Sequence, residues 1–267
     1  LREAQAKVEH RVANSGMAVL LDAGMEKGIH PAKKQIAGER LAEEKWNDAW
    51  AEYFKKKGYS VVKVNSKRGG GIKSIQGVIQ EACKEKIERD RKRGILNRPV
   101  RAMVVGIPNV GKSTFINALA GKACAKTGNK PGVTKGKQWI RLNKNVELLD
   151  TPGILWPKFE DQTVGLRLAF IGSIKDEILN TEELGGELIR FLVQSYPGVL
   201  QEKYDVSESQ DIYACLEEIA KNRHCLVRGS ELDMEKAARL LLDDFRNGRI
   251  GRITLEFPQD YEETDGE

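Results

Sequence analysis

GIPNVGKST, the stretch from Gly106 to Thr114, has the pattern of a phosphate-binding loop, GxxxxGK[ST]. A buried strand, VRAMVVGIP, leads into it, and a helix, KSTFINALAG, follows it. In such a loop, glycines let backbone N–H groups point at phosphate oxygens, and the helix N-terminus adds partial positive charge. The lysine reaches the β- and γ-phosphates, and the next hydroxyl ligates Mg²⁺. We therefore predict a nucleotide-phosphate site made by Asn109, Val110, Gly111, Lys112, Ser113 and Thr114.

Two downstream motifs complete a nucleotide switch. In DTPG, at the end of a strand, Asp150 can hold the Mg²⁺ shell and Gly153 can offer its N–H to the γ-phosphate. Between the two motifs lies PGVT, in which Thr134 either completes Mg²⁺ coordination or is an ordinary turn threonine. Motifs in this order are typical of GTPases, whose loops sense the γ-phosphate and relax after its loss. The predicted Mg²⁺ ligands are Ser113, Thr134 and Asp150, and the predicted catalytic residues are Lys112, Thr134 and Gly153.

The tripeptide NSK, Asn65 to Lys67, follows a strand and precedes a long helix. It looks like the last GTPase motif, the loop that packs against the guanine base. We therefore predict that Asn65, Ser66 and Lys67 bind GTP. Here the motif comes before the phosphate loop, which indicates a circular permutation: the same sheet is cut at a different connection, so chain order changes while neighbours in space do not.

The bulk composition is that of a globular protein, with 40% hydrophobic and 31% charged residues. No apolar run approaches the ~20 residues that cross a bilayer, so no membrane span is expected. The first residues, LREAQAKVEH, are polar and charged, unlike a secretory signal. The four cysteines lack zinc-like spacing, which favours reduced thiols in a cytoplasmic protein. We expect a monomer.

Charge and secondary-structure pattern both change near residue 180. Residues 1–179 hold 34 Lys and Arg against 19 Asp and Glu, whereas residues 180–267 hold 10 against 20. The basic part suits a polyanionic partner, although a solvated surface without a partner is the alternative. Strands alternate with helices in the first part and predict a doubly wound, mostly parallel α/β sheet, while the second part reads as helices only. The predicted domains are therefore 1–178 and 179–267.

The chain resembles the circularly permuted GTPases of the ribosome biogenesis GTPase A type from about Glu43 onward. The resemblance is carried by VNSKRGGGI, GIPNVGKSTFINALAGK, AKTGNKPGVTKGKQW, ELLDTPGILWPKFED and GRITLEFP. It implies a P-loop GTPase fold with a C-terminal helical domain that helps to dock on ribosomal RNA. It also implies GTP and GDP as ligands with Mg²⁺, and GTP hydrolysis coupled to late assembly of the bacterial large ribosomal subunit, which would stimulate it.

Two features bear on hydrolysis. Ile154 follows DTPG where a Ras-like protein has a glutamine that orients the attacking water, and the family's alternative, a histidine in a PGHM segment, has no match here. The residue that orients the water is therefore not identified, and His10 lies outside any matching motif. Asn109 resembles the asparagine of GTPases in which K⁺ replaces an arginine finger. Whether K⁺ binds here as a second cation beside Mg²⁺ stays open.

The guanine-reading motif NKxD is the main departure from the family. The equivalent stretch reads IAGERLAEEKW, residues 36–46, without Asn-Lys or Asp. Three explanations stay open: residues are missing between pieces that read as adjacent, the first 45 residues are altered, or base selectivity has been lost. Because an Asp-to-base contact is charge-assisted, its loss would blunt discrimination against ATP.

Two other functions compete with the GTPase: a generic P-loop ATPase, and a nucleotide-gated RNA-binding module without catalysis. Candidate RNA contacts flank the first switch, at Lys122, Lys126, Lys130, Lys135, Lys137, Arg141 and Lys144. In the acidic C-terminal part, the arginines that are either RNA contacts or ordinary surface residues are Arg239, Arg246, Arg249 and Arg252.

Overall fold

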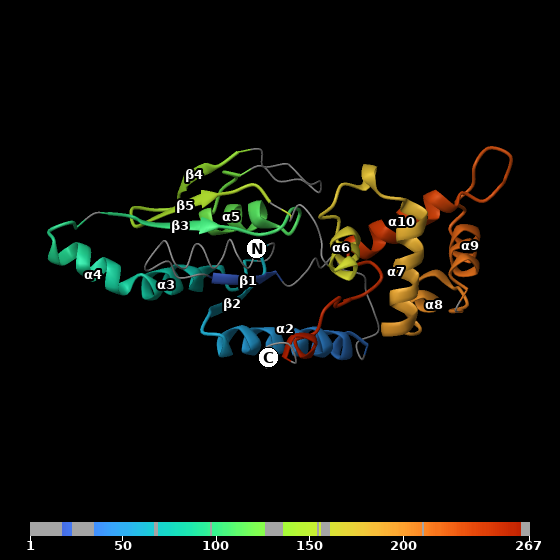
Figure 1. Ribbon diagram of the computed structural model, residues 1–267, viewed down its shortest axis with the longest axis horizontal. Coiled ribbons are helices and arrows are strands. Elements are labelled where there is room, and N and C mark those ends of the chain that lie inside the picture. The colour runs from blue at the N-terminus through green and yellow to red at the C-terminus, as the bar shows by residue number, and fades with distance from the viewer. Residues whose placement is uncertain are drawn as a thin grey trace. The chain divides into compact units, whose positions relative to one another are not determined.

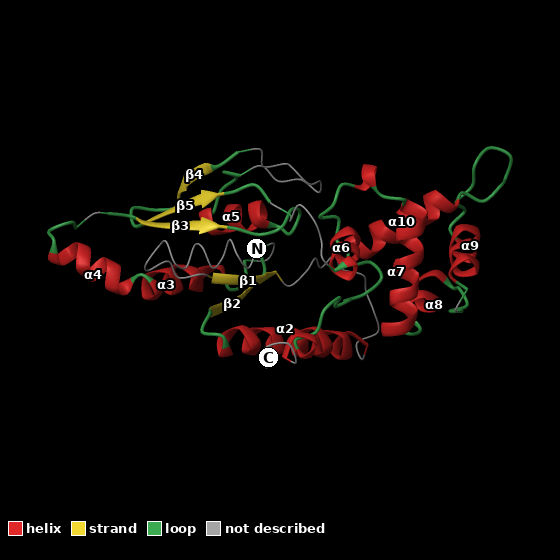
Figure 2. Cartoon of the chain, in the orientation of Figure 1, coloured by secondary structure: helices red, strands yellow, loops and turns green. Residues whose placement is uncertain are grey.

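The computed structural model describes residues 18–22, 35–66, 69–96, 98–125, 136–153, 155, 161–209 and 211–262 (Figures 1 and 2). The chain divides into two compact units. Unit 1 comprises Leu1–Gly24, Lys33–Lys158 and Glu256–Glu267, and unit 2 comprises Met25–Ala32 and Phe159–Leu255. None of the helices in the described part is long and apolar enough to cross a membrane.

The described strands of unit 1 form two sheets. In the first, β3 (Val100–Val104) pairs in parallel with β5 (Val146–Asp150), and β4 (Gln138–Arg141) pairs with β5 antiparallel. In the second, β1 (Ala18–Asp22) pairs in parallel with β2 (Ser60–Val64). The antiparallel pair is a consequence of the short NKN turn, since parallel neighbours need a long crossover. The α/β character and the mostly parallel pairing predicted from the sequence are confirmed.

Helices α3 (Ile72–Ala82) and α5 (Lys112–Ala120) contribute to the core of unit 1 together with the strands. Their inward side chains meet those of β2, β4 and β5 in one cluster of buried residues: Val64, Ile72, Ile75, Phe115, Ile116, Ala125, Ile140, Val146 and Leu148. Alternate residues of β5 are buried, which is the pattern of a strand with one covered face. Asp150 belongs to that buried set, so the pleat itself carries its carboxylate inward.

The last described segment of the chain packs against α2 (Gln35–Lys56), a helix of 22 residues. The ring centroids of Trp46 and Phe257 are 4.7 Å apart, and those of Trp50 and Tyr261 are 5.6 Å apart. The indole N–H of Trp50 also donates a hydrogen bond to the carbonyl of Glu256, at 3.3 Å. This aromatic contact fixes the segment that contains the short helix α11 (Gln259–Glu262) to unit 1.

Unit 2 is built from α6 (Gln162–Phe170), the 3₁₀ helix η1 (Asp176–Ile178), α7 (Thr181–Ser195), α8 (Val199–Tyr204), α9 (Ile212–Asn222) and α10 (Met234–Arg246). The longer helices begin at side-chain caps, as at Asp211, whose carboxylate accepts from two backbone N–H groups. Leu188, Leu192, Ile219 and Leu241 are fully buried between these helices.

The division into units differs from the sequence boundary at 178/179 at both ends. Ala169 and Phe170 at the end of α6 are buried in the helical core, so unit 2 begins before that boundary. Residues after Glu256 pack on α2, so the last segment belongs to unit 1. Both differences come from contacts between residues far apart in the chain, which a local helical pattern does not reveal.

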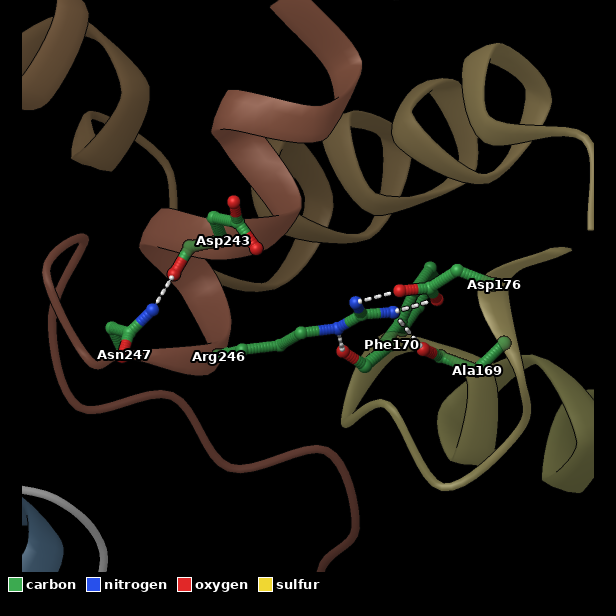
Figure 3. Close-up of polar contacts among 6 residues, drawn as sticks. All are labelled: Ala169, Phe170, Asp176, Asp243, Arg246 and Asn247. Atoms are coloured by element: carbon green, nitrogen blue, oxygen red, sulfur yellow. Dashed lines mark hydrogen bonds and ion pairs between the residues drawn. The ribbon is translucent and has the colours of Figure 1, made fainter. Parts of the chain in front are cut away.

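Arg246, which the sequence analysis names as a candidate RNA contact, instead forms hydrogen bonds and an ion pair within unit 2 (Figure 3). Its guanidinium donates to the carbonyls of Phe170 and Ala169, at 2.9 and 2.8 Å, and pairs with both carboxylate oxygens of Asp176 at 2.7 and 2.8 Å. Both carbonyls lie in the last turn of α6, where helix carbonyls need partners from outside the helix, and the Ala169 carbonyl also accepts from the Gly172 N–H at 3.0 Å. Arg249 is engaged as well, because it pairs with Asp244, which also accepts from the buried Tyr204 hydroxyl at 2.9 Å.

We expect Arg246→Ala to lower the free energy of unfolding by about 2 kcal/mol, because it removes the donor to the Phe170 carbonyl and breaks the ion pair with Asp176. Arg246→Lys is expected to recover only part of this, since an ammonium lacks the fork that meets two carbonyls and a carboxylate together. Urea unfolding measures both variants. Arg239→Ala is the matched control on the same helix: its exposed pair with Glu235 is expected to contribute less than about 0.5 kcal/mol. Equal losses at the two arginines would contradict the assigned role.

Candidate nucleotide site

The loop between β3 and α5 has the backbone of a phosphate-binding loop. Gly111, which caps α5, has φ 88° and ψ 13°, and Asn109 has φ 59°. Both lie in the left-handed region, which glycine adopts freely and asparagine adopts more readily than most residues. Such a conformation directs successive N–H groups to one side and forms a concave anion site. The turn therefore has the shape that the motif predicts.

Lys112, the first residue of α5, folds back across this loop. Its Nζ donates to the carbonyl of Ile107 at 2.7 Å. Burial lowers the pKa of Lys112, and the charge of Asp150 opposes that effect. The ammonium is thus held over the loop and partly removed from water, so an anion placed there would interact with it more strongly than in solvent.

The DTPG turn lies against the same loop. The Thr151 hydroxyl donates to the carbonyl of Val104, the last residue of β3, at 2.7 Å. Gly153 also lies against the phosphate loop: a Cβ built on it would lie 2.5 Å from Cα of Pro108 and 2.9 Å from Nζ of Lys112. A side chain cannot fit there, which accounts for the glycine. The structure therefore brings together Lys112, Asp150 and Gly153, as the sequence predicts.

The surroundings of Asp150 show most directly whether a cation would fit at this site. The side chain belongs to a residue only 2% exposed, and within the described residues its Oδ1 has no hydrogen-bond partner. Burial raises the pKa of Asp150, while the charge of Lys112 and the Thr151 N–H oppose the rise. An unsatisfied buried carboxylate oxygen is costly, and a hard cation such as Mg²⁺ is the partner that carboxylates hold in nucleotide sites. The residue therefore fits a magnesium ligand.

The loop predicted to contact the base is described for Asn65 and Ser66. The Asn65 N–H donates to the carbonyl of Gly70 at 2.9 Å, and the Gly69 N–H donates back to Asn65 at 2.8 Å, so the loop closes on itself. The Ser66 hydroxyl is buried and, among the described residues, has no hydrogen-bond partner. Lys67, Thr134 and Ile154 lie outside the described residues, as do Lys126, Lys130 and Lys135.

Two residues near the site were not singled out by the sequence motifs. Thr151 ties the DTPG turn to β3, and Asn117 of α5 bonds the backbone at Cys124 and Ala125. Thr151 stands inside a known motif, but its role depends on the neighbouring strand. For Asn117 the available signal is an amide within the apolar run FINALA of α5, where asparagine is a poor helix former.

Comparisons with known proteins identify the family. Residues 101–227 match the 50S ribosome-binding GTPase family. The chain is 46% identical over 232 residues to ribosome biogenesis GTPase A of Bacillus cereus, which covers 86% of this chain and 77% of that protein. The chain belongs to the ribosome biogenesis GTPase A family. The member from Thermotoga maritima is 30% identical over 220 residues, covering 82% of this chain and 74% of that protein.

Solved structures agree with this family. A GNP-bound YlqF from T. maritima has a TM-score of 0.52 and 27% identity, covering 81% of this chain and 77% of that one. A GDP-bound YlqF, with a TM-score of 0.56, 24% identity and coverage of 96% and 92%, has the same fold. As a member of this family, the chain is a circularly permuted P-loop GTPase that hydrolyses GTP. The strand–loop–helix unit from β2 to α3 accordingly precedes the phosphate loop in the chain while sharing its core.

Proposed function

We propose that this GTPase acts in late assembly of the large (50S) ribosomal subunit and that its reaction takes place between the phosphate loop and the DTPG turn. The main support is that these two segments lie against each other, with the carboxylate of Asp150 buried beside them. Family membership supports the ribosomal role, because the relatives are ribosome biogenesis GTPases. The proposed partner implies that the reaction occurs in the cytoplasm, and we propose separately that the chain acts as a monomer.

Each residue has a distinct role in this proposal. The N–H groups from Asn109 to Thr114 hold the α- and β-phosphates, and Lys112 stabilises charge that grows on the β- and γ-phosphate oxygens. Ser113 and Asp150 hold Mg²⁺, with Thr134 as a further ligand in the GTP state. Bound Mg²⁺ neutralises phosphate charge. The Gly153 N–H donates to the γ-phosphate and so reports its loss.

Base recognition is proposed for Asn65, Ser66 and Lys67. The hydrogen bonds of Asn65 with Gly69 and Gly70 support this, because they hold the start and the end of the loop together. The second cation, K⁺ at Asn109, is also kept as a proposal. The left-handed backbone of Asn109 is by itself a sufficient reason for an asparagine at that position. A role in binding K⁺ therefore requires that the rate of GTP hydrolysis be higher in K⁺ than in Na⁺.

Ribosomal RNA is the proposed polyanionic partner. On the described part of unit 1, four candidate side chains near the first switch are exposed: Lys122, Lys137, Arg141 and Lys144. Phosphate contacts of this kind dominate affinity for nucleic acid and weaken as salt increases. We propose that they, rather than the internally bonded Arg246 and Arg249, contact RNA. A role for the predicted domain 179–267 in docking on RNA remains part of the proposal.

Hydrolysis of radiolabelled GTP and ATP, each alone and with purified 50S or 30S subunits, tests this function. We expect GTP to be turned over faster than ATP and 50S subunits to stimulate it at least about 10-fold, as when a partner completes a GTPase site. Equal rates with ATP would favour the generic ATPase. Binding of GTP and RNA without any stimulated turnover would favour the non-catalytic module, and equal stimulation by 30S subunits would contradict the 50S assignment.

A further inference from the structure

One face of the sheet β3–β5–β4 carries a row of apolar side chains that remain open to solvent. In the strand register, Met103 of β3 and Trp139 of β4 both stand opposite Leu149 of the central strand β5. Residues directly opposite each other lie close together, so the three side chains form a continuous row. Met103 is 47% exposed and Trp139 is 52% exposed. The other face of the same strands is closed, since Ile140 and Leu148 belong to the buried core of unit 1.

The next row on this face is charged. Two residues along from the apolar row, Arg101 and Arg141 both stand opposite Glu147, and they share its face because side chains alternate along a strand. Nε of Arg101 donates to a carboxylate oxygen of Glu147 at 3.3 Å. The Arg101 guanidinium also lies over the ring of Trp139, 5.0 Å from its centroid. Glu147 therefore holds a cation beside the exposed indole, in a cation–π contact.

The charges around Trp139 favour an anionic partner. Among the described residues of the three strands, Glu147 is the only acid on this face, and it is engaged by Arg101. Lys137 directly precedes β4 and Lys144 lies in the turn to β5, and both are exposed. The apolar row thus lies among cations, which indicates a partner that carries negative charge.

The size of the apolar row favours a nucleobase over a protein surface. A group of exposed apolar side chains commonly marks an interaction site. A stable protein–protein interface takes about 20 to 30 residues from each partner, far more than the row of Met103, Leu149 and Trp139 supplies. An unpaired base, in contrast, needs only one aromatic or guanidinium plane to stack on, while the phosphates beside it meet Lys and Arg.

We propose that Trp139 is a base-stacking residue for RNA: an unpaired base stacks on the exposed part of the indole, and the neighbouring phosphates contact the cations around it. This inference rests on the proposed function, in which ribosomal RNA is the partner, and it adds single-stranded segments as the class of RNA recognised. Arg101 helps to fix the orientation of the indole. Bases within a duplex are already stacked on one another, so this platform discriminates against double-stranded RNA.

Fluorescence anisotropy with the full chain and a labelled oligoadenylate of about 12 nucleotides tests the proposal, with an RNA duplex of the same length as the comparison. For Trp139→Ala we expect the single strand to bind about 10-fold more weakly, as the loss of one stacked base would give, while affinity for the duplex changes less than about 2-fold. Trp139→Phe keeps an aromatic ring and is expected to stay within about 3-fold of wild type. Trp139→Leu keeps apolar bulk without a π-face and is expected to lose as much affinity as alanine.

Tyr213→Ala is the matched control, because Tyr213 is also an exposed aromatic residue but lies on α9, in the acidic part of the chain. It is expected to leave both affinities within about 2-fold of wild type, since no basic surface surrounds it there. Salt dependence separates stacking from charge. Trp139→Ala is expected to leave the slope of log affinity against log salt unchanged, whereas Arg141→Ala is expected to make it shallower, because only the arginine neutralises a phosphate.

Intrinsic fluorescence gives a second measurement on the same complex. The chain has four tryptophans. A base stacked on Trp139 is expected to quench its emission, so most of the quenching that oligoadenylate produces in the wild type is expected to be absent in Trp139→Phe. If the alanine variant has a much lower urea midpoint, the comparison of Trp139→Leu with Trp139→Phe decides, since both keep a large apolar side chain against Leu149.

Equal affinities of wild type and Trp139→Ala for the single strand, or equal losses for single strand and duplex, would overturn the proposal. Wild-type affinity in Trp139→Leu would overturn it as well, because the contact would then need only an apolar surface. A dimer in light scattering that Trp139→Ala dissociates would assign this face to a second copy of the chain. A wild-type protein whose GTP hydrolysis 50S subunits do not stimulate would instead refute the proposed function itself, so the two failures are distinguishable.

Discussion

Replacing Lys112 with alanine is expected to weaken binding of GDP and GTP about 100-fold or more, because the loss of a charge-assisted contact to two phosphates is worth about 3 kcal/mol. In the structure the ammonium is already positioned over the loop by its bond to the Ile107 carbonyl, at 2.7 Å. The substitution therefore removes a pre-oriented charge, while the backbone that forms the loop stays. Titration of a fluorescent GDP derivative measures the change.

The matched control for this change is Lys122→Ala, which removes the same charge from an exposed position just past the end of α5. It is expected to leave the affinity for the nucleotide within about 2-fold, since exposed charges are strongly screened. Circular dichroism of Lys112→Ala checks that the fold is intact. If the two variants bound GDP equally well, the loop from Gly106 to Thr114 would not be the phosphate site.

Gly153→Ala is expected to reduce kcat for GTP about 30- to 100-fold, because overpacking at the contact costs about 2 to 3 kcal/mol. The new Cβ would lie 2.5 Å from Cα and 2.6 Å from N of Pro108, and 2.9 Å from Nζ of Lys112. Two of these three atoms belong to the backbone of the phosphate loop and cannot rotate away. Either the loop or the DTPG turn must therefore shift, which moves the Gly153 N–H away from its proposed contact with the γ-phosphate.

Gly77→Ala is the control for this substitution, since a Cβ at Gly77 would meet nothing within 4 Å. It lies within α3, where alanine is favoured over glycine by about 1 kcal/mol, so the variant is expected to be at least as stable as wild type and fully active. Single-turnover hydrolysis compares the two. GDP affinity of Gly153→Ala is expected to fall much less than kcat; unchanged hydrolysis would show that the turn does not take part.

Much of the candidate site follows from short contiguous motifs. The strand, loop and helix around Lys112 form where the sequence predicts them, because left-handed glycine and asparagine positions and a helix start are local requirements; the strand is not buried as predicted, since Met103 is 47% exposed. The approach of Asp150 and Gly153 to that loop is seen in the structure, while their roles toward nucleotide and Mg²⁺ stay predictions. It is predictable because parallel strands end at the same edge of a sheet, and the final residues of β3 and β5, Val104 and Asp150, are partners in the register.

Other features depend on partners that no local pattern names. Arg246 looks like a surface arginine in the chain, but the α6 carbonyls and Asp176, about seventy residues away, enclose its guanidinium. The terminal GRITLEFP resembles the family, yet contacts of α2 with this end, such as the edge-on contact of Trp46 with Phe257, show that it belongs to unit 1. Asn117 likewise meets its partners, the backbone groups of Cys124 and Ala125, only when the chain turns back after Gly121.

The amino-acid sequence by itself determined the phosphate loop, the order of the switch motifs and the permuted position of NSK, because each needs only a few neighbouring residues with particular backbone preferences. The tertiary structure alone decided where the units divide, which arginines are internal and which backbone groups the Asn117 amide meets. These depend on hydrogen bonds and packing between residues distant in the chain, whose energies exist only after the helices and strands have been brought together.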